Sequence, residues 1–174
     1  MKTKQSFKIG DKIVHFGRIH KIFKTEEEED SRGRVEKIIY FKPYFKTKDK
    51  RSLICSIPVA NIDKTGIRKP ISKQRLAKLL RACAKKTKFQ KPINISRAKK
   101  ILETDELARI VWVLRSLWRE KNDESINFTK SRRDVLKNAV NRLKEEVAFV
   151  SGLSLRESRK KIKQALKKGV SQQV

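Results

Sequence analysis

The residues best suited to chemistry in this sequence are lysines that could bind phosphate. Four of them stand within residues 85–91 (Lys85, Lys86, Lys88 and Lys91), just before a proline and the expected start of a helix. Lysine side chains and the backbone N–H groups of a helix N-terminus can act on the same anion, so this loop is a candidate phosphate-binding element. A solvated basic linker is the alternative interpretation.

No motif for catalysis accompanies these lysines. The sequence lacks the glycine-rich phosphate loop, the dinucleotide-binding glycine pattern, the His-Glu-x-x-His metal motif and the Gly-x-Ser-x-Gly nucleophile turn. We therefore assign no catalytic residue and no cofactor, and we expect no enzymatic activity.

The cysteines and histidines do not indicate a metal site. Cys55 and Cys83 lie 28 residues apart, and His15 and His20 have no recognised zinc-ligand spacing with them. We expect two reduced thiols and no bound metal.

The acidic run at residues 26–30 is expected to form a charged hairpin tip that discourages aggregation at a sheet edge and faces away from DNA.

The two tryptophans lie on different faces of one expected helix. Trp118 belongs to the apolar stripe, which predicts a place in the core. Trp112 stands six residues earlier, and at about 100° per residue it points to the other side, near Arg109, Arg115 and Arg119. It is either a second packing layer or an exposed aromatic among arginines. The second interpretation makes Trp112, Arg115 and Arg119 candidates for DNA contact.

Positive charge dominates the composition. The 174 residues include 46 Lys and Arg against 19 Asp and Glu, a net charge of +27, of which residues 71–174 carry +18. A folded unit of that charge favours nucleic acid as its partner. The longest apolar run, residues 110–114, is far shorter than the roughly 20 residues that span a bilayer, and no signal peptide is recognisable at residues 1–6. We expect a cytoplasmic protein of the bacterial nucleoid without membrane contact.

These candidate residues fall on elements of two kinds, which predict the α+β class. We expect a tail at 1–6, a small antiparallel β-barrel at 7–62, a linker at 63–71, a domain of about five helices at 72–169 and a tail at 170–174. The helices are expected at 72–86, 96–103, 105–121, 134–150 and from 154 to near 169. Thr104, Ser131 and Ser154 are the expected helix caps. We recognise no internal repeat.

Four short segments follow one another in a specific order. They are Phe-Lys-Ile-Gly-Asp-Lys-Ile-Val at 7–14, Ile-Pro at 57–58 with Ala-Asn at 60–61, Asn-Ile-Ser-Arg at 94–97, and Val-Leu-Arg-Ser-Leu-Trp-Arg at 113–119. This order resembles the CarD/CdnL family of bacterial transcription regulators over about residues 7–150. The resemblance implies a Tudor-like barrel that binds the RNA polymerase β subunit. It also implies a helical domain that binds promoter DNA at the upstream edge of the bubble and stabilises the open complex. We expect the protein to be a monomer.

The resemblance also assigns individual residues. Arg97 and Lys100 match basic positions of the family that contact the DNA backbone. Ile95 stands where the family has a tryptophan that wedges into the minor groove. Isoleucine is an accepted wedge but lacks the stacking area and the N–H of an indole, so a weaker grip is expected. Ser56 stands where the family often has an arginine, so the polymerase-binding candidates are Lys24, Arg51 and Ser56.

Two other interpretations stay open. One is a general nucleic-acid-binding or nucleoid protein without polymerase contact, and the other is an adaptor that uses the barrel alone. The last helix, from residue 154 onward, is more basic than the resemblance leads us to expect, and the sequence does not assign it a role.

Overall fold

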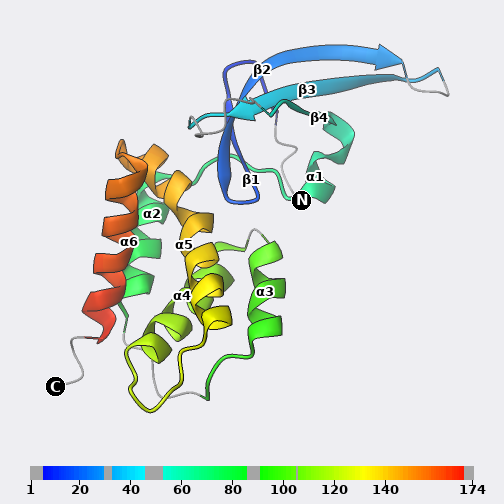
Figure 1. Ribbon diagram of the computed structural model, residues 1–174. Helices are drawn as coiled ribbons and strands as arrows, with labels where there is room; N and C mark the ends of the chain where they lie inside the picture. The colour runs from blue at the N-terminus through cyan, green and yellow to red at the C-terminus, as the bar shows by residue number, and fades with distance from the viewer. Residues whose placement is uncertain (1–5, 30–32, 46–52, 86–90, 105, 171–174) are drawn as a thin grey trace. The chain divides into compact units, whose positions relative to one another are not determined.

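The chain forms two compact units, Met1–Pro70 and Ile71–Val174, which we call the sheet unit and the helical unit (Figure 1). The computed structural model describes residues 6–29, 33–45, 53–85, 91–104 and 106–170. The α+β class is confirmed, because a four-stranded antiparallel sheet comes first and helices follow it.

The sheet unit is a meander in which each strand pairs with the next. Its strands are β1 (Lys12–His15), β2 (Arg18–Glu29), β3 (Val35–Pro43) and β4 (Cys55–Pro58), in the order β1-β2-β3-β4. β1 and β4 are not neighbours, so the sheet is open over the residues that the structure describes. The closed, Tudor-like barrel predicted from the sequence is therefore not confirmed.

Alternating apolar residues place the core on one face of this sheet. Ile13, Ile22, Ile39 and Phe41 are buried, and they pack with Phe7, Ile62 and Ile67. A 3-10 turn (Val59–Asn61) and the short helix α1 (Ile62–Thr65) follow β4. Arg68 then exchanges two backbone hydrogen bonds with Val14 of β1. Most of the segment expected to be a linker thus packs within the sheet unit.

The helical unit contains five helices around one core in the described residues, in agreement with the number expected. They are α2 (Lys73–Ala84), α3 (Ile95–Glu103), α4 (Leu107–Lys121), α5 (Lys130–Ser151) and α6 (Leu155–Val170). In this unit α4 packs against α2, α3 and α5, while α6 packs against α2 and α5.

The helix boundaries follow the local capping chemistry. Ser154 and Glu157 form the predicted capping box: Glu157 N–H donates to Ser154 Oγ, and Ser154 N–H donates back to Glu157 Oε2. The expected caps Ser131 and Thr104 are wrong. Thr129 caps α5 two residues before the expected cap, because its hydroxyl accepts from Arg132 N–H. Glu106 is the cap position of α4.

The chain contains an internal repeat that we did not expect. Residues 69–80 and 91–102 share the pattern Lys-Pro-Ile-Ser/Asn-x-x-Arg-x-x-Lys-x-Leu. In each copy the Ser or Asn caps the following helix by accepting from the arginine N–H, at 3.2 Å in α2 and 3.0 Å in α3. The isoleucine before each cap is buried, and its N–H donates to a buried glutamate. The repeat is thus a recurring device for starting a helix at a fixed place.

Candidate nucleic-acid interface

The predicted DNA-binding segment begins where α3 begins. Asn94 caps the helix, Ile95 is its first residue, and Arg97 and Lys100 follow on exposed positions. Lys99, which the sequence analysis did not single out, is exposed beside Lys100. A helix N-terminus attracts anions through its unpaired N–H groups and its dipole. The start of α3 therefore places the exposed Arg97 beside a favourable dipole, while Lys99 and Lys100 lie further along the helix, Lys100 in its last turn.

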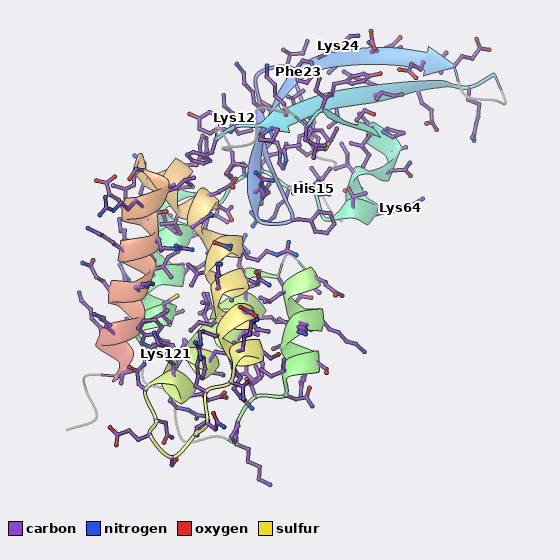
Figure 2. The ribbon with its side chains drawn as sticks, viewed as in Figure 1. Lys12, His15, Phe23, Lys24, Lys64 and Lys121 are labelled. Carbon is purple, nitrogen blue, oxygen red and sulfur yellow. The ribbon has the colours of Figure 1, made fainter. Side chains whose placement is uncertain are left out.

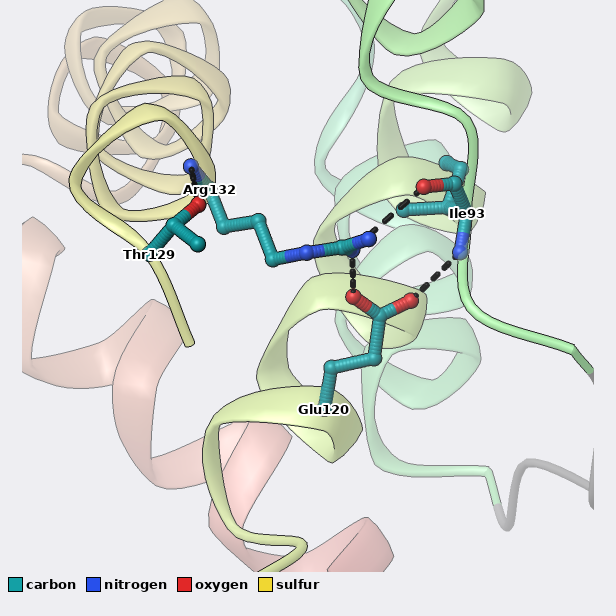
Figure 3. Close-up of polar contacts among 4 residues, drawn as sticks. All are labelled: Ile93, Glu120, Thr129 and Arg132. Atoms are coloured by element: carbon teal, nitrogen blue, oxygen red, sulfur yellow. Dashed lines mark hydrogen bonds and ion pairs between the residues drawn. The ribbon is translucent and has the colours of Figure 1, made fainter. Parts of the chain in front are cut away.

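A buried ion pair fixes the start of α3 (Figure 3). Glu120 of α4 is fully buried; its Oε1 accepts from Ile93 N–H at 2.6 Å and its Oε2 pairs with the guanidinium of Arg132 from α5. The same guanidinium donates to the Ile93 carbonyl at 3.3 Å. Both backbone groups of Ile93 are thereby tied to α4 and α5. Because Ile93 stands two residues before Ile95, this contact sets where α3 starts.

Trp112 is brought to the same place by α4. Its ring is half-buried against the core, and the guanidinium carbon of Arg97 lies 6.0 Å from the ring centroid. A cation above an indole ring gains about 0.5–1 kcal/mol at an exposed site. The half-buried position agrees with the interpretation of Trp112 as a packing layer, and the ring also holds Arg97, a basic side chain that is exposed on α3.

Ile95 lies on the border between the core and the surface. Its side chain is half-buried and packs against the core of the helical unit. That packing fixes the direction of the side chain but leaves only part of its apolar surface exposed. The wedge role implied by the family resemblance stays a prediction for this residue.

Arg115 and Arg119 point into the helical unit. Arg115 is half-buried, and its Nη2 donates to the Lys85 carbonyl at 3.0 Å, one residue after the end of α2. Arg119 is 9% exposed. A guanidinium beside the carbonyl end of a helix offsets the negative end of its dipole. Because Arg115 is bound to the end of α2 and Arg119 is buried, we leave both residues out of the interface proposed below.

The basic loop is described only at its ends. Lys85 and Lys91 are both exposed. Lys86 and Lys88 lie outside the described residues, as does Arg51 of the sheet unit.

Cys83 is buried at the end of α2, and burial raises the pKa of its thiol to about 11.

On the sheet unit, Lys24 and Ser56, two residues expected to bind polymerase, flank Tyr40 of β3. Lys24 of β2 pairs in register with Tyr40 of β3, and Tyr40 pairs with Ser56 of β4. The three side chains therefore share one face, opposite the buried Ile39 and Phe41. Lys24, which Figure 2 shows on β2, lies with its ammonium 5.2 Å from the centre of the Tyr40 ring and pairs with Glu26.

Tyr40 is held in place by its hydroxyl, which donates to Glu28 Oε1 at 2.6 Å. That hydrogen bond raises the pKa of Tyr40 to about 12. The alternation of residues along β3 could have indicated Tyr40, because position 40 faces outward between the core residues Ile39 and Phe41. We call Lys24, Tyr40 and Ser56 the outer row.

Among the residues described, no group of His, Cys, Asp and Glu side chains could hold a metal ion. None of the described helices is long and apolar enough to cross a membrane. No protein-family model and no curated protein matches the chain.

Proposed function

We propose that the chain is a CarD/CdnL-type transcription regulator, with the helical unit bound to promoter DNA at the upstream edge of the bubble and the sheet unit bound to the RNA polymerase β subunit. The observation that carries the proposal is the contact of Arg97 with Trp112 beside the fixed start of α3. It joins a preorganised cation, a helix N-terminus and a rigid apolar support on one surface.

Under this proposal the helical unit binds DNA with few contacts to the bases. Arg97, Lys99 and Lys100 are suited to phosphate contacts, which position a protein on the duplex without reading bases. Ile95 would enter the minor groove at the junction between duplex and bubble and oppose closure of the bubble. A stabilisation of about 1.4 kcal/mol would shift the balance of open and closed complexes tenfold.

Binding to polymerase would use the outer row. Lys24 is a charged group whose orientation is fixed by the Tyr40 ring and by Glu26, so little side-chain entropy is lost when a partner binds. Tethering the helical unit to polymerase raises its effective concentration at the promoter. The DNA contacts can then be individually weak.

Capture of polymerase tests the tether. Full-length protein carrying Lys24→Glu with Tyr40→Ala should recover far less polymerase than the parent. Lys37→Glu is the matched control for the charge reversal. Lys37 is exposed on β3, three residues before Tyr40, and its side chain projects from the other face of the sheet. Equal recovery by the parent and the Lys24/Tyr40 variant would refute the outer row as the contact. If the parent itself recovers no polymerase, the nucleoid-protein alternative replaces the proposal.

The wedge has its own test. Ile95→Trp should lengthen the lifetime of open complexes, because an indole adds stacking area at the junction. If the lifetime is unchanged or shorter, Ile95 is not the wedge.

A further inference from the structure

A second basic surface lies on the helical unit, away from α3. The helices α2 and α6 pack side by side, and between them runs an open groove of about 610 Å³. Its lining includes Leu80, Arg81 and Ala84 from α2 and Lys161, Ala165 and Lys168 from α6. Figure 1 shows α3 and α6 on opposite sides of the unit, with α4 and α5 between them. We call this surface the α2–α6 groove.

Charge on these two helices is almost entirely positive. α2 carries four basic residues and no acidic one, and α6 carries seven basic residues and one acidic one. The single acid, Glu157, is engaged by Ser154 at the first turn of α6. Arg81, Lys161 and Lys168 on the two rims are all exposed.

Small residues let the two helices approach closely at their C-terminal ends. Gly169 of α6 is buried, and a Cβ at this position would lie 3.1 Å from the Lys85 carbonyl oxygen. Ala84 and Ala165 form part of the groove wall nearby. The apolar faces of both helices, including Leu79, Ile162 and Leu166, are buried in the core. The rims are therefore held at a fixed separation, and α6 has no apolar face free to enter a lipid bilayer.

We propose that the α2–α6 groove is a second, sequence-independent site for the phosphate backbone of duplex nucleic acid. Neither helix carries an aromatic residue, so the surface has nothing on which unstacked bases could stack. Lys161 and Lys168 are about 10 Å apart along the helix axis. A duplex presents about six phosphate charges over that length.

The proposed function needs only the α3 face. With a second duplex-binding surface on the opposite side of the helical unit, a single chain can also bind two duplex segments at once. The α3 face, with Trp112, binds at a distorted site, and the α2–α6 groove holds ordinary duplex.

A bridging assay tests this with full-length protein and needs no polymerase. One duplex is fixed on beads, and capture of a second, fluorescent duplex is measured over a range of salt concentrations. The groove variant is Arg81→Gln/Lys161→Gln/Lys168→Gln. The matched control, Lys130→Gln/Arg133→Gln/Lys137→Gln, removes the same charge from exposed positions of α5.

The groove variant should capture at least tenfold less of the second duplex than the control variant. Its slope of log affinity against log salt should fall by about 2 to 3, since each lost phosphate contact lowers it by about 0.9. Single-stranded DNA should compete poorly for bridging. Equal bridging by the two variants overturns the proposal. Unchanged duplex binding by the groove variant also overturns it and would indicate an acidic protein as the occupant. Bridging also needs the α3 face to bind a duplex, whereas the change in duplex binding on removal of the groove charges does not. A parent chain that binds duplex without bridging therefore contradicts the α3 face and not the groove.

Discussion

Replacing Glu120 by glutamine tests the contact that fixes α3. Glu120 is fully buried, accepts from Ile93 N–H and pairs with Arg132. Glutamine keeps the size of the side chain but removes the charge and turns one acceptor into a donor. Either Ile93 N–H or the Arg132 guanidinium must then face an N–H group.

The cost can be worked from the contacts that are lost. A buried donor left without an acceptor costs about 1–3 kcal/mol, and removing one partner of a buried ion pair costs about 3–5 kcal/mol. Arg132 keeps its bond to the Ile93 carbonyl, and its side chain is 18% exposed, so the lower part of the range applies. We expect a loss of about 3 kcal/mol. For a unit of this size that lowers the melting temperature by roughly 10–20 °C.

Tryptophan fluorescence can follow this change in the full chain, because Trp112 and Trp118 are the two tryptophans of the sequence and both belong to the helical unit. Glu124→Gln is the matched control. It removes the same charge from an exposed position after α4 and should change stability by less than about 0.5 kcal/mol. If Glu120→Gln unfolds within 1 kcal/mol of the parent, the buried pair does not hold the start of α3.

Three further predictions concern other parts of the chain. Burial lowers the pKa of His20 to about 4. As pH falls from about 6.5 to 4 the unfolded chain binds a proton that the folded sheet unit does not, so the free energy of unfolding should fall by about 3 kcal/mol. A His20→Leu variant that keeps this pH dependence in urea unfolding would contradict the assignment to His20. Phe16 has a positive φ of 49° in a tight turn before Gly17. Asparagine tolerates this backbone conformation better, so Phe16→Asn should stabilise the sheet unit by about 0.5–1 kcal/mol. A lower melting temperature for this variant would mean that the ring contact with His15 outweighs the backbone strain. Iodoacetamide should label the half-buried Cys55 well before Cys83, whose thiol is buried with a raised pKa; peptide mass spectrometry that finds Cys83 labelled first would refute its burial.

Much of the helical unit follows from local sequence signals. Apolar periodicity predicted its five helices, and the Ser154–Glu157 spacing predicted the start of α6, because these signals act between neighbouring residues. The position of Trp118 in the core was also predictable from its place on the apolar stripe.

What the sequence did not reveal depends on contacts between distant segments. Glu120 lies 27 residues from Ile93 and looks like a solvated helix residue until α5 brings Arg132 beside it. Arg115 and Arg119 share a helix face that looked exposed, but the end of α2 packs against it. The repeat was missed because its two copies share mainly the residues that start a helix.

The sheet unit shows the same limit. Alternation predicted its strands, but whether β1 and β4 meet depends on pairing that no local pattern encodes. The outer row likewise appears only once the register of β2, β3 and β4 is known.

The lifetime of promoter open complexes challenged with heparin tests the central claim most directly. The parent chain should lengthen that lifetime, and Arg97→Gln/Lys100→Gln should lose most of the effect. Lys130→Gln/Arg133→Gln, which removes the same charge from exposed positions of α5, should keep it. A parent chain that leaves the lifetime unchanged, or an α3 variant as active as the α5 control, would contradict the proposal that the α3 face holds the promoter open.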